Sequence, residues 1–434
     1  MKPEDFDIVH LGESVIESPL EHSIFVKESA RVAYHSEVAD LDKDFVDDER
    51  ILSFEKAGPR QKIFHDPAWS KAAILTAGGL CPGLNDVIKG LTYTLKAHYK
   101  VPIVYGIPYG YQGLIPDFGH KPILLDEESV DDIHEHGGTI LGSSRGRQDE
   151  ERMVDTLVRM NINILFCIGG DGTLRCAHDI CKVIKKRKLS ITVIGIPKTI
   201  DNDVGFIDQS FGFETAVYAT NPVITAAHNE AKGVENGIGL IKVMGRDSGF
   251  IAAYAALANS HVNYCLIPEE KFTLGDHGPR DLFDSIKERL KQRKHAVVMI
   301  AEGAGQELID DDSVETDASG NRLHADIGVF LKKRFKELGA RDGMRIEVKY
   351  FDPSYMIRSL PAHGTDAVFC LMLAQNAVHA AMAGRTDMVV GHWNSKFTHV
   401  PISLATRERK KIETNRALWN SVLAVTWPSY SGRN

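Results

Sequence analysis

The sequence predicts an α/β fold of two three-layer αβα domains with largely parallel sheets, and three observations support this. Short apolar runs alternate with helix-length segments from about residue 71 to about residue 390, a rhythm that indicates parallel strands covered by helices on both faces. Glycine-rich turns follow several of these runs, and ligands of such sheets gather beyond the carboxyl ends of the strands. The 434 residues, 43% of them hydrophobic, are enough for two well-buried cores.

The expected elements follow one another in a regular order. Each strand is a short apolar run that ends at a turn, and each helix fills the longer stretch between two such runs. Strands are expected at 73–76, 103–107, 162–168, 191–196, 238–243, 264–267, 296–301, 346–350 and 388–390. Helices are expected from near residue 85 and at 150–160, 214–229, 250–257, 280–292, 327–338 and 365–382. The series that begins with helix 214–229 predicts a second α/β layer.

The ends of the chain and one internal stretch do not follow this rhythm. Residues 1–70 lack a clean period and carry six acidic residues between positions 40 and 49. We interpret them as an N-terminal extension that packs on the body or on a neighbouring subunit; a partly disordered arm is an equally good interpretation. The run Asp310–Asp312 and the nearby Gly320 are typical of a surface loop.

Composition excludes several classes of function. The net charge of −8 and the pI near 6.1 argue against a general nucleic-acid binder. The six cysteines contain no CxxC pair, which favours reduced core thiols in a reducing compartment. No apolar run reaches the length of a membrane span, and the acidic start does not resemble a signal peptide. We therefore expect a cytoplasmic protein without nucleic-acid or membrane partners.

Two motifs carry the chemistry. Gly169-Gly170-Asp171-Gly172-Thr173 follows one buried strand, and a glycine turn that opens a helix offers backbone N–H groups to phosphate oxygens. The carboxylate of Asp171 could hold Mg²⁺ against those phosphates; taken alone, the motif could also be a turn without a ligand. Pro197–Asp203 (PKTIDND) follows the next strand and ends in two aspartates. The pair indicates phosphoryl transfer to an alcohol.

Together these motifs resemble the 6-phosphofructokinase family. The resemblance continues in order from about residue 70 to about residue 400. Within the family, the chain is similar to the type A branch that includes the plant and trypanosomatid ATP-dependent enzymes. It is carried further by segments 76–79, 82–85, 137–145, 244–246, 301–303 and 355–358. A lipid or NAD kinase would share only the GGDGT turn. A catalytically silent regulatory subunit would be expected to have lost Asp171, Asp201 or Arg246, and all three are present.

The resemblance implies a domain division. It predicts two Rossmann-like domains with the active site in the cleft between them. Residues 71–212 plus about 357–400 would form the nucleotide or phosphate-donor domain, 213–356 the fructose 6-phosphate domain, and 401–434 a C-terminal extension. A homotetramer or homodimer and allosteric control are also implied. Lys349 matches a basic position that reaches a neighbouring subunit's substrate, whereas Gly237 replaces a second arginine of the small bacterial enzymes.

The resemblance also implies roles on the acceptor side. Asp201 would be the general base for the C1 hydroxyl of fructose 6-phosphate, and Thr199 would position that hydroxyl or the transferred phosphoryl group. Arg246 would bridge sugar and phosphate, and Asp203 would tune the base or hold the metal shell. Structural roles are the alternatives for Asp203 and Glu302. The full set of expected sugar-phosphate contacts is Thr199, Ile200, Asp201, Met244, Gly245, Arg246, Glu302, Lys349, Tyr355 and Arg358.

Donor contacts are expected from the glycine loops, with ATP favoured over pyrophosphate. Pyrophosphate users commonly carry aspartate at the position of Gly172, so the glycine leaves room for a nucleotide. Lys198 is a feature of pyrophosphate users, and Cys176 replaces a usual glycine and either crowds the nucleotide or packs as a small hydrophobic residue. The expected donor set is Gly79, Arg145, Gly146, Gly170, Asp171, Gly172 and Thr173, with Asp171 as the Mg²⁺ ligand. For Arg145, beside Arg147, the alternative is a solvated basic loop.

Overall fold

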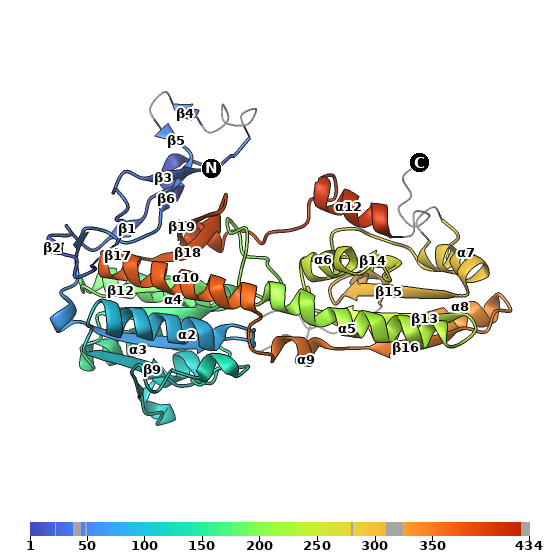
Figure 1. Cartoon of the computed structure of the whole chain (residues 1–434), viewed down its shortest axis with the longest axis horizontal. Coiled ribbons are helices and arrows are strands. Elements are labelled where there is room, and N and C mark those ends of the chain that lie inside the picture. The colour runs from blue at the N-terminus through green and yellow to red at the C-terminus, as the bar shows by residue number, and fades with distance from the viewer. Residues whose placement is uncertain (22, 38–44, 48–49, 279–280, 310–323, 427–434) are drawn as a thin grey trace. The chain divides into compact units, whose positions relative to one another are not determined.

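The computed structural model describes residues 1–21, 23–37, 45–47, 50–278, 281–309 and 324–426 (Figure 1). The chain divides into two compact units, each assembled from separate stretches of sequence. Unit 1 comprises Met1–Thr199, Val204–Gly212 and Ser359–Arg409; unit 2 comprises Ile200–Asp203, Phe213–Arg358 and Lys410–Asn434. The PKTIDND motif therefore begins in unit 1, and its two aspartates belong to unit 2.

Unit 1 is built on a nine-stranded sheet with the strand order β10-β9-β8-β11-β12-β18-β19-β6-β3. Strands β9, β8, β11, β12 and β18 are parallel, and β10, β19, β6 and β3 extend the sheet with antiparallel pairs. Their bounds are β3 (Arg31–Ala33), β6 (Ser53–Lys56), β8 (Lys71–Ala77), β9 (Ile103–Ile107), β10 (Ile123–Leu125), β11 (Ile164–Gly169), β12 (Thr192–Pro197), β18 (Met388–Trp393) and β19 (Lys396–Pro401).

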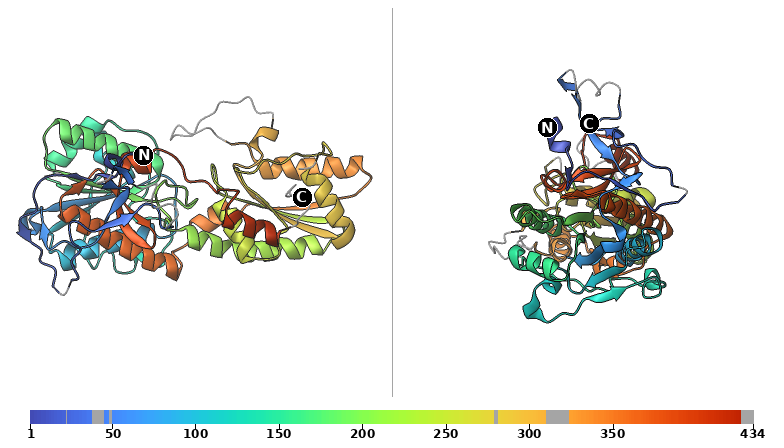
Figure 2. Two further views of the ribbon diagram at one scale, coloured as in Figure 1. Left: turned by 90° about the horizontal axis from the view of Figure 1, so that it is seen from above. Right: turned by 90° about the vertical axis from the view of Figure 1, so that its left-hand side faces the viewer.

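Helices cover both faces of this sheet (Figure 2, left). Successive residues of a strand face opposite sides, and Leu165 and Cys167 of β11 pack with α4, while Phe166 and Ile168 are buried on the other side. That other side includes α2 and α10, which approach so closely that a Cβ on Gly90 would lie 2.7 Å from Cβ of Ala374. The helices are α2 (Leu84–Tyr93), α3 (Glu150–Arg159), α4 (Asp171–Lys186), α10 (Gly364–Met382) and α11 (Ile402–Ala405).

Residues 1–70 belong to unit 1 wherever they are described. Besides β3 and β6, they supply short strands that pair with one another or with β17 (Arg385–Thr386). These are β1 (Val9–His10), β2 (Ile16–Glu17), β4 (Phe45–Asp47), β5 (Arg50–Ile51) and β7 (Lys62–Ile63). The fully buried Phe6 and Phe54 join the same hydrophobic cluster as β11 and α4. The extension is thus part of the packed body of its own chain.

Unit 2 is a four-stranded parallel sheet with the order β14-β15-β13-β16. One face packs against α5, α6 and α12 through residues such as Ile241 and Val243, and the other packs against α7 and α8 through Leu240 and Ile300. The elements are α5 (Phe213–Lys232), β13 (Gly237–Val243), α6 (Phe250–Ala258), β14 (Tyr264–Leu266), α7 (Leu282–Arg293), β15 (His295–Ala301), α8 (Ile327–Arg341), β16 (Glu347–Phe351), α9 (Ser354–Arg358) and α12 (Ala417–Val425).

The predicted fold class is confirmed, since each expected strand and helix is present within a few residues of its predicted bounds. The predicted loop at 310–320 and most of the acidic run at 40–49 lie outside the described residues. All six cysteines are free and buried. Within the described part of the chain, we find no helix with the length and apolar character needed to span a bilayer.

Candidate functional site

The parallel register of unit 1 brings three loops to one edge of its sheet. Gly169, at the end of β11, stands opposite Ala77 of β8 on one side and Pro197 of β12 on the other. The loops that follow these strands therefore all start from the same edge. Two of them are the loops that the sequence singled out for the phosphoryl donor, Gly170–Thr173 and the segment that begins at Lys198.

These two loops lie against each other, and glycine is what permits it. The backbone N–H of Lys198 donates to the carbonyl oxygen of Gly169 at 3.0 Å. A Cβ on Gly169 would lie 2.3 Å from Oγ1 of Thr173, and one on Gly170 would lie 3.3 Å from the carbonyl oxygen of Lys198. A side chain at Gly169 would thus break the turn, because real Cβ atoms do not approach so closely.

Helix α4 begins inside the GGDGT motif. Gly170 is the residue that precedes the helix, and Asp171, Gly172 and Thr173 form its first turn, where backbone N–H groups have no partner within the helix. A Cβ on Gly172 meets no atom of the described residues within 4 Å. Open space next to the positive end of a helix fits the phosphates of a bound nucleotide.

Asp171 is the metal-ligand candidate of this turn. Its side chain is 18% exposed, accepts a hydrogen bond from Nη2 of Arg175 at 2.9 Å, and lies 3.9 Å from Nη2 of Arg409. A carboxylate oxygen beside a phosphate-sized space is the kind of ligand that Mg²⁺ prefers. The residues present could therefore hold a magnesium–nucleotide complex, in which Asp171 would be the protein ligand.

The remaining donor-side residues surround the same edge. Lys198 is buried, and its Nζ would lie 3.3 Å from a Cβ on Gly78. Arg145 is exposed, and Gly146 has a positive φ of 98°. Arg147 forms ion pairs with Glu150 of α3 and with Asp179 of α4.

Cys176 lies one turn further into α4 and belongs to the hydrophobic cluster of unit 1. Burial raises the pKa of its thiol to about 12, so at neutral pH it is an uncharged group. Its packing favours the interpretation of Cys176 as a small hydrophobic residue over that of an obstacle to the nucleotide.

A second set of residues lies at the carboxyl edge of the sheet in unit 2. Val243 of β13 stands opposite Ala301 of β15, so Met244–Arg246 and Glu302 leave neighbouring strands at the same level. The backbone N–H of Glu302 donates to Val243 at 2.9 Å, and that of Gly303 donates to Gly245 at 3.0 Å. A Cβ on Gly303 would lie 1.8 Å from the carbonyl oxygen of Arg246. The Arg246 and Glu302 loops can lie together only because Gly303 has no side chain.

Glu302 is held in a mixed environment. Burial raises the pKa of its carboxyl group, while the positive charges of Arg246 and Lys242 act in the opposite direction. The net direction is upward, so burial prevails over the nearby cations. A carboxylate that is partly desolvated is a strong acceptor for sugar hydroxyl groups, because each hydrogen bond that a ligand donates replaces lost water.

Asp201 and Asp203 join this second set in unit 2. The hydroxyl of Ser248 donates to the carbonyl oxygen of Asp201 at 3.4 Å, and the N–H of Lys410 donates to that of Asp203 at 2.8 Å. Asn202 between them has a positive φ of 55° and is buried, and asparagine is one of the few residues that tolerate this conformation. The backbone of Asp201, the expected base, thus contacts Ser248, which lies two residues after Arg246.

The other predicted sugar-phosphate residues are distributed between the units. Thr199 belongs to unit 1, where its carbonyl oxygen accepts from the hydroxyl of Ser210 at 2.6 Å. Tyr355 and Arg358 share helix α9 in unit 2, with the guanidinium 4.4 Å from the centre of the tyrosine ring. Tyr355 is 74% exposed. Lys349, on β16, lies 3.9 Å from Glu230.

Two supporting residues of unit 2 were missed in the sequence. Oε1 of Glu269 accepts from the N–H of Gly249 at 3.1 Å and from that of Ile412 at 2.9 Å, which ties the Arg246–Gly249 loop to the C-terminal segment. Lys242 forms ion pairs of 2.9 Å with Asp326 and with Asp352. Neither Glu269 nor Lys242 belongs to a sequence motif. The one signal in the sequence is that both lie near the carboxyl end of a predicted strand.

Comparison with known proteins places the chain in a family. The sequence profile of the phosphofructokinase family matches residues 71–381, and the chain belongs to that family. A relative in Borreliella burgdorferi named ATP-dependent 6-phosphofructokinase is 46% identical over 443 aligned positions, which cover 99% of this chain and 98% of the relative. ATP-dependent 6-phosphofructokinase 7 of Arabidopsis thaliana is 44% identical over 89% of this chain and 79% of its own length.

Solved structures show the same fold at low sequence identity. The pyrophosphate-dependent phosphofructokinase of Marinobacter aquaeolei superposes with a TM-score of 0.65 and 21% identity, covering 84% of this chain and 92% of that one. The phosphofructokinase of Saccharomyces cerevisiae gives a TM-score of 0.62, also at 21% identity, with 84% of this chain and 48% of that chain covered. The resemblance that the sequence motifs predicted is thereby confirmed.

Proposed function

We propose that this chain is an ATP-dependent 6-phosphofructokinase, which transfers a phosphoryl group from ATP to the C1 hydroxyl of fructose 6-phosphate and so forms fructose 1,6-bisphosphate in glycolysis. The observation that carries the proposal is the identity of 44–46% to proteins named ATP-dependent 6-phosphofructokinase along most or all of the chain. The donor loops of unit 1 and the acceptor loops of unit 2 supply residues for each half of the reaction.

On the donor side, the N–H groups of the Gly170–Thr173 turn bind the phosphates, and the open space at Gly172 accommodates the nucleotide. Asp171 holds Mg²⁺, which neutralises charge on the phosphates when it is bound. Gly79, Arg145 and Gly146 complete the proposed contacts with the donor.

On the acceptor side, Asp201 takes the proton of the C1 hydroxyl, and Arg246 stabilises the charge of the transferring phosphoryl group. Glu302 accepts hydrogen bonds from the sugar hydroxyls, and Tyr355 and Arg358 hold the 6-phosphate. Little covalent chemistry falls to the protein in such a transfer, so its contribution is positioning and charge stabilisation. Thr199, Ile200, Met244, Gly245 and Lys349 are the further proposed contacts, and Asp203 supports the base.

Pyrophosphate is the alternative donor, and the buried Lys198 favours it, because an ammonium group at this edge would compensate the charge of a compact donor. Initial rates of fructose 1,6-bisphosphate formation, with Mg²⁺ and either ATP or pyrophosphate, test the proposal. We expect a strong preference for ATP. A preference for pyrophosphate would overturn the donor assignment, and no product with either donor would overturn the reaction.

A cytoplasmic location, allosteric control and a homotetramer or homodimer belong to the same proposal. The six free thiols fit a reducing compartment. Sedimentation of the purified protein tests the oligomer, and a monomer at working concentration would contradict it.

A further inference from the structure

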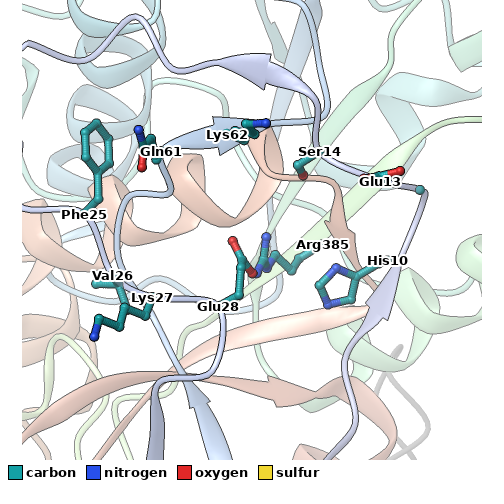
Figure 3. Close-up of a pocket in the computed structure, with 11 residues that line it drawn as sticks. His10, Glu13, Ser14, Phe25, Val26, Lys27, Glu28, Gln61, Lys62 and Arg385 are labelled. Carbon is teal, nitrogen blue, oxygen red and sulfur yellow. The ribbon is translucent and has the colours of Figure 1, made fainter.

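A pocket of about 530 Å³ lies in unit 1, formed largely by the N-terminal extension (Figure 3). Its lining contains none of the residues proposed for the donor or the acceptor. Its walls come from three stretches of the extension and from one residue of β17. The lining residues are His10, Gly12, Glu13, Ser14, Phe25, Val26, Lys27, Glu28, Gln61, Lys62 and Arg385.

Buried charges that do not balance lie behind this pocket. Arg60 and Arg385 are each 1% exposed, and both donate to the same oxygen of the buried Glu55, at 3.0 and 2.8 Å. The third partner of that oxygen, Nδ1 of His399 at 3.1 Å, belongs to a ring whose pKa burial lowers. Two guanidinium groups therefore share one buried carboxylate. A surplus buried positive charge is costly unless an anion meets it.

Glu28 is the anion that balances this positive charge, and its side chain is exposed to solvent. Its side chain is 63% exposed, contacts Nη2 of Arg385 and lies 3.4 Å from Nε of Arg60. Figure 3 shows Glu28 and Arg385 side by side in the pocket. A flexible surface glutamate loses side-chain entropy when it is held this way. The two arginines are fixed by the core, whereas their outer anion can be exchanged.

The rim of the pocket offers further positive groups. Lys27 and Lys62 are exposed and line the pocket, and among the described residues neither has an ion pair. His10 pairs with Arg385 across β1 and β17 and lies 3.6 Å from Glu55. Glu13 is the second acid of the lining, so the lining has three permanent cations and two acids. Without Glu28, Glu13 would be the only acid of the lining, and Arg385 would keep only its share of the buried Glu55.

We propose that this pocket binds a small molecule with a phosphate group, and that the phosphate replaces the Glu28 carboxylate on Arg385. Nε and Nη1 of Arg385 are held by Glu55 and the carbonyl oxygen of Ala383, so Nη2, which contacts Glu28, is the nitrogen that would donate to a phosphate oxygen. Lys27 and Lys62 add point charges at the rim. The volume lies in the range of small-molecule sites, so a metabolite of nucleotide size fits. Bound there, the ligand joins residues 10–14, 25–28 and 61–62 of the extension to β17.

The test uses the full chain and inorganic phosphate as the probe, with amide hydrogen exchange followed by mass spectrometry at constant ionic strength. We expect phosphate to slow exchange in peptides that cover residues 24–30. Glu28→Gln removes the competing carboxylate, so it should lower the phosphate concentration for half-maximal protection about fivefold. Lys62→Gln should raise that concentration by about the same factor. Lys121→Gln, an exposed lysine outside the pocket, should leave it unchanged.

Two outcomes would overturn the proposal. One is protection confined to the active-site peptides around residues 170–175 and 354–358 in all four proteins. The other is a half-maximal concentration that Glu28→Gln leaves unchanged, since Glu28 would then be a structural ion pair only. A parallel experiment with citrate, at the same concentration of negative charge, compares a carboxylate ligand with phosphate. Stronger protection by citrate would contradict the phosphate assignment. Fructose 6-phosphate kinase activity is measured in parallel, so failure of the pocket and failure of the proposed function remain distinct.

Discussion

The space at Gly172 is the feature from which donor choice can be tested most directly. Gly172 is exposed in the first turn of α4, and a Cβ there meets no atom of the described residues within 4 Å. Gly172→Asp therefore fits without a clash and adds a negative charge where the proposed nucleotide phosphates bind. Two unit charges about 4 Å apart interact by about 4 kcal/mol at an effective dielectric constant of about 20. Solvent at this exposed turn reduces that value.

We expect kcat/KM for ATP to fall about 10- to 10²-fold, which corresponds to roughly 1.4–2.7 kcal/mol. Stability should be unchanged or slightly higher, because a carboxylate in the first turn of a helix gains about 0.3–1 kcal/mol. Gly364→Asp is the matched control, since Gly364 is also exposed, lies in the first turn of α10 and has no atom of the described residues near its Cβ position. Steady-state kinetics and Tm are the measurements. Wild-type kcat/KM for ATP in Gly172→Asp would refute the placement of the donor at this turn.

Three further substitutions test the acceptor side. Asp201→Ser should lower kcat about 10²- to 10⁴-fold with an unchanged urea midpoint, and a fully active variant would exclude Asp201 as the base. Glu302→Gln should raise Tm at pH 7, because burial raises the pKa of the carboxyl and penalises its charged form. That gain should disappear as the pH falls below the ordinary value of 4.5, while KM for fructose 6-phosphate increases at neutral pH. Gly303→Ala should lower kcat more than tenfold, since its Cβ would displace the carbonyl of Arg246; unchanged kinetics would show that this loop can move freely.

The parallel core and its loops could be predicted because local signals agree with the tertiary structure there. The run at 162–168 is apolar enough to be recognised as a buried strand, and the glycines after it mark the turn that β11 and α4 make. The two loops of PKTIDND and MGR follow strands in the same way. Which loops lie side by side then follows from the parallel register, since the carboxyl ends of neighbouring strands meet at one edge.

The N-terminal extension could not be predicted in this way. Strands β3 and β6 contain few residues, and Ser53 and Glu55 are polar although both are buried. Glu55 is stable there because Arg60 and Arg385 approach it, and Arg385 is distant in sequence. Its pKa is lowered although burial alone would raise it, because the contacts with His10 and His399 and the charge of Arg385 prevail. No periodicity of hydrophobic residues reveals a contact of this kind.

The contacts of the C-terminal segment could not be predicted from the sequence either, and they involve the candidate site. Lys410 and Ile412 follow the last part of unit 1 in the sequence, yet their N–H groups bind Asp203 and Glu269. The buried Trp419 of α12 packs in the same cluster as α6, which begins directly after Gly249. One carboxylate, Glu269, thus fixes both the start of α6 and the C-terminal segment, and burial raises the pKa of its carboxyl group. Every residue except proline has a backbone N–H group, so a sequence motif cannot show which of them bind a distant side chain or carbonyl. The residues that hold the Asp201 and Arg246 loops in place could therefore be identified only in the structure.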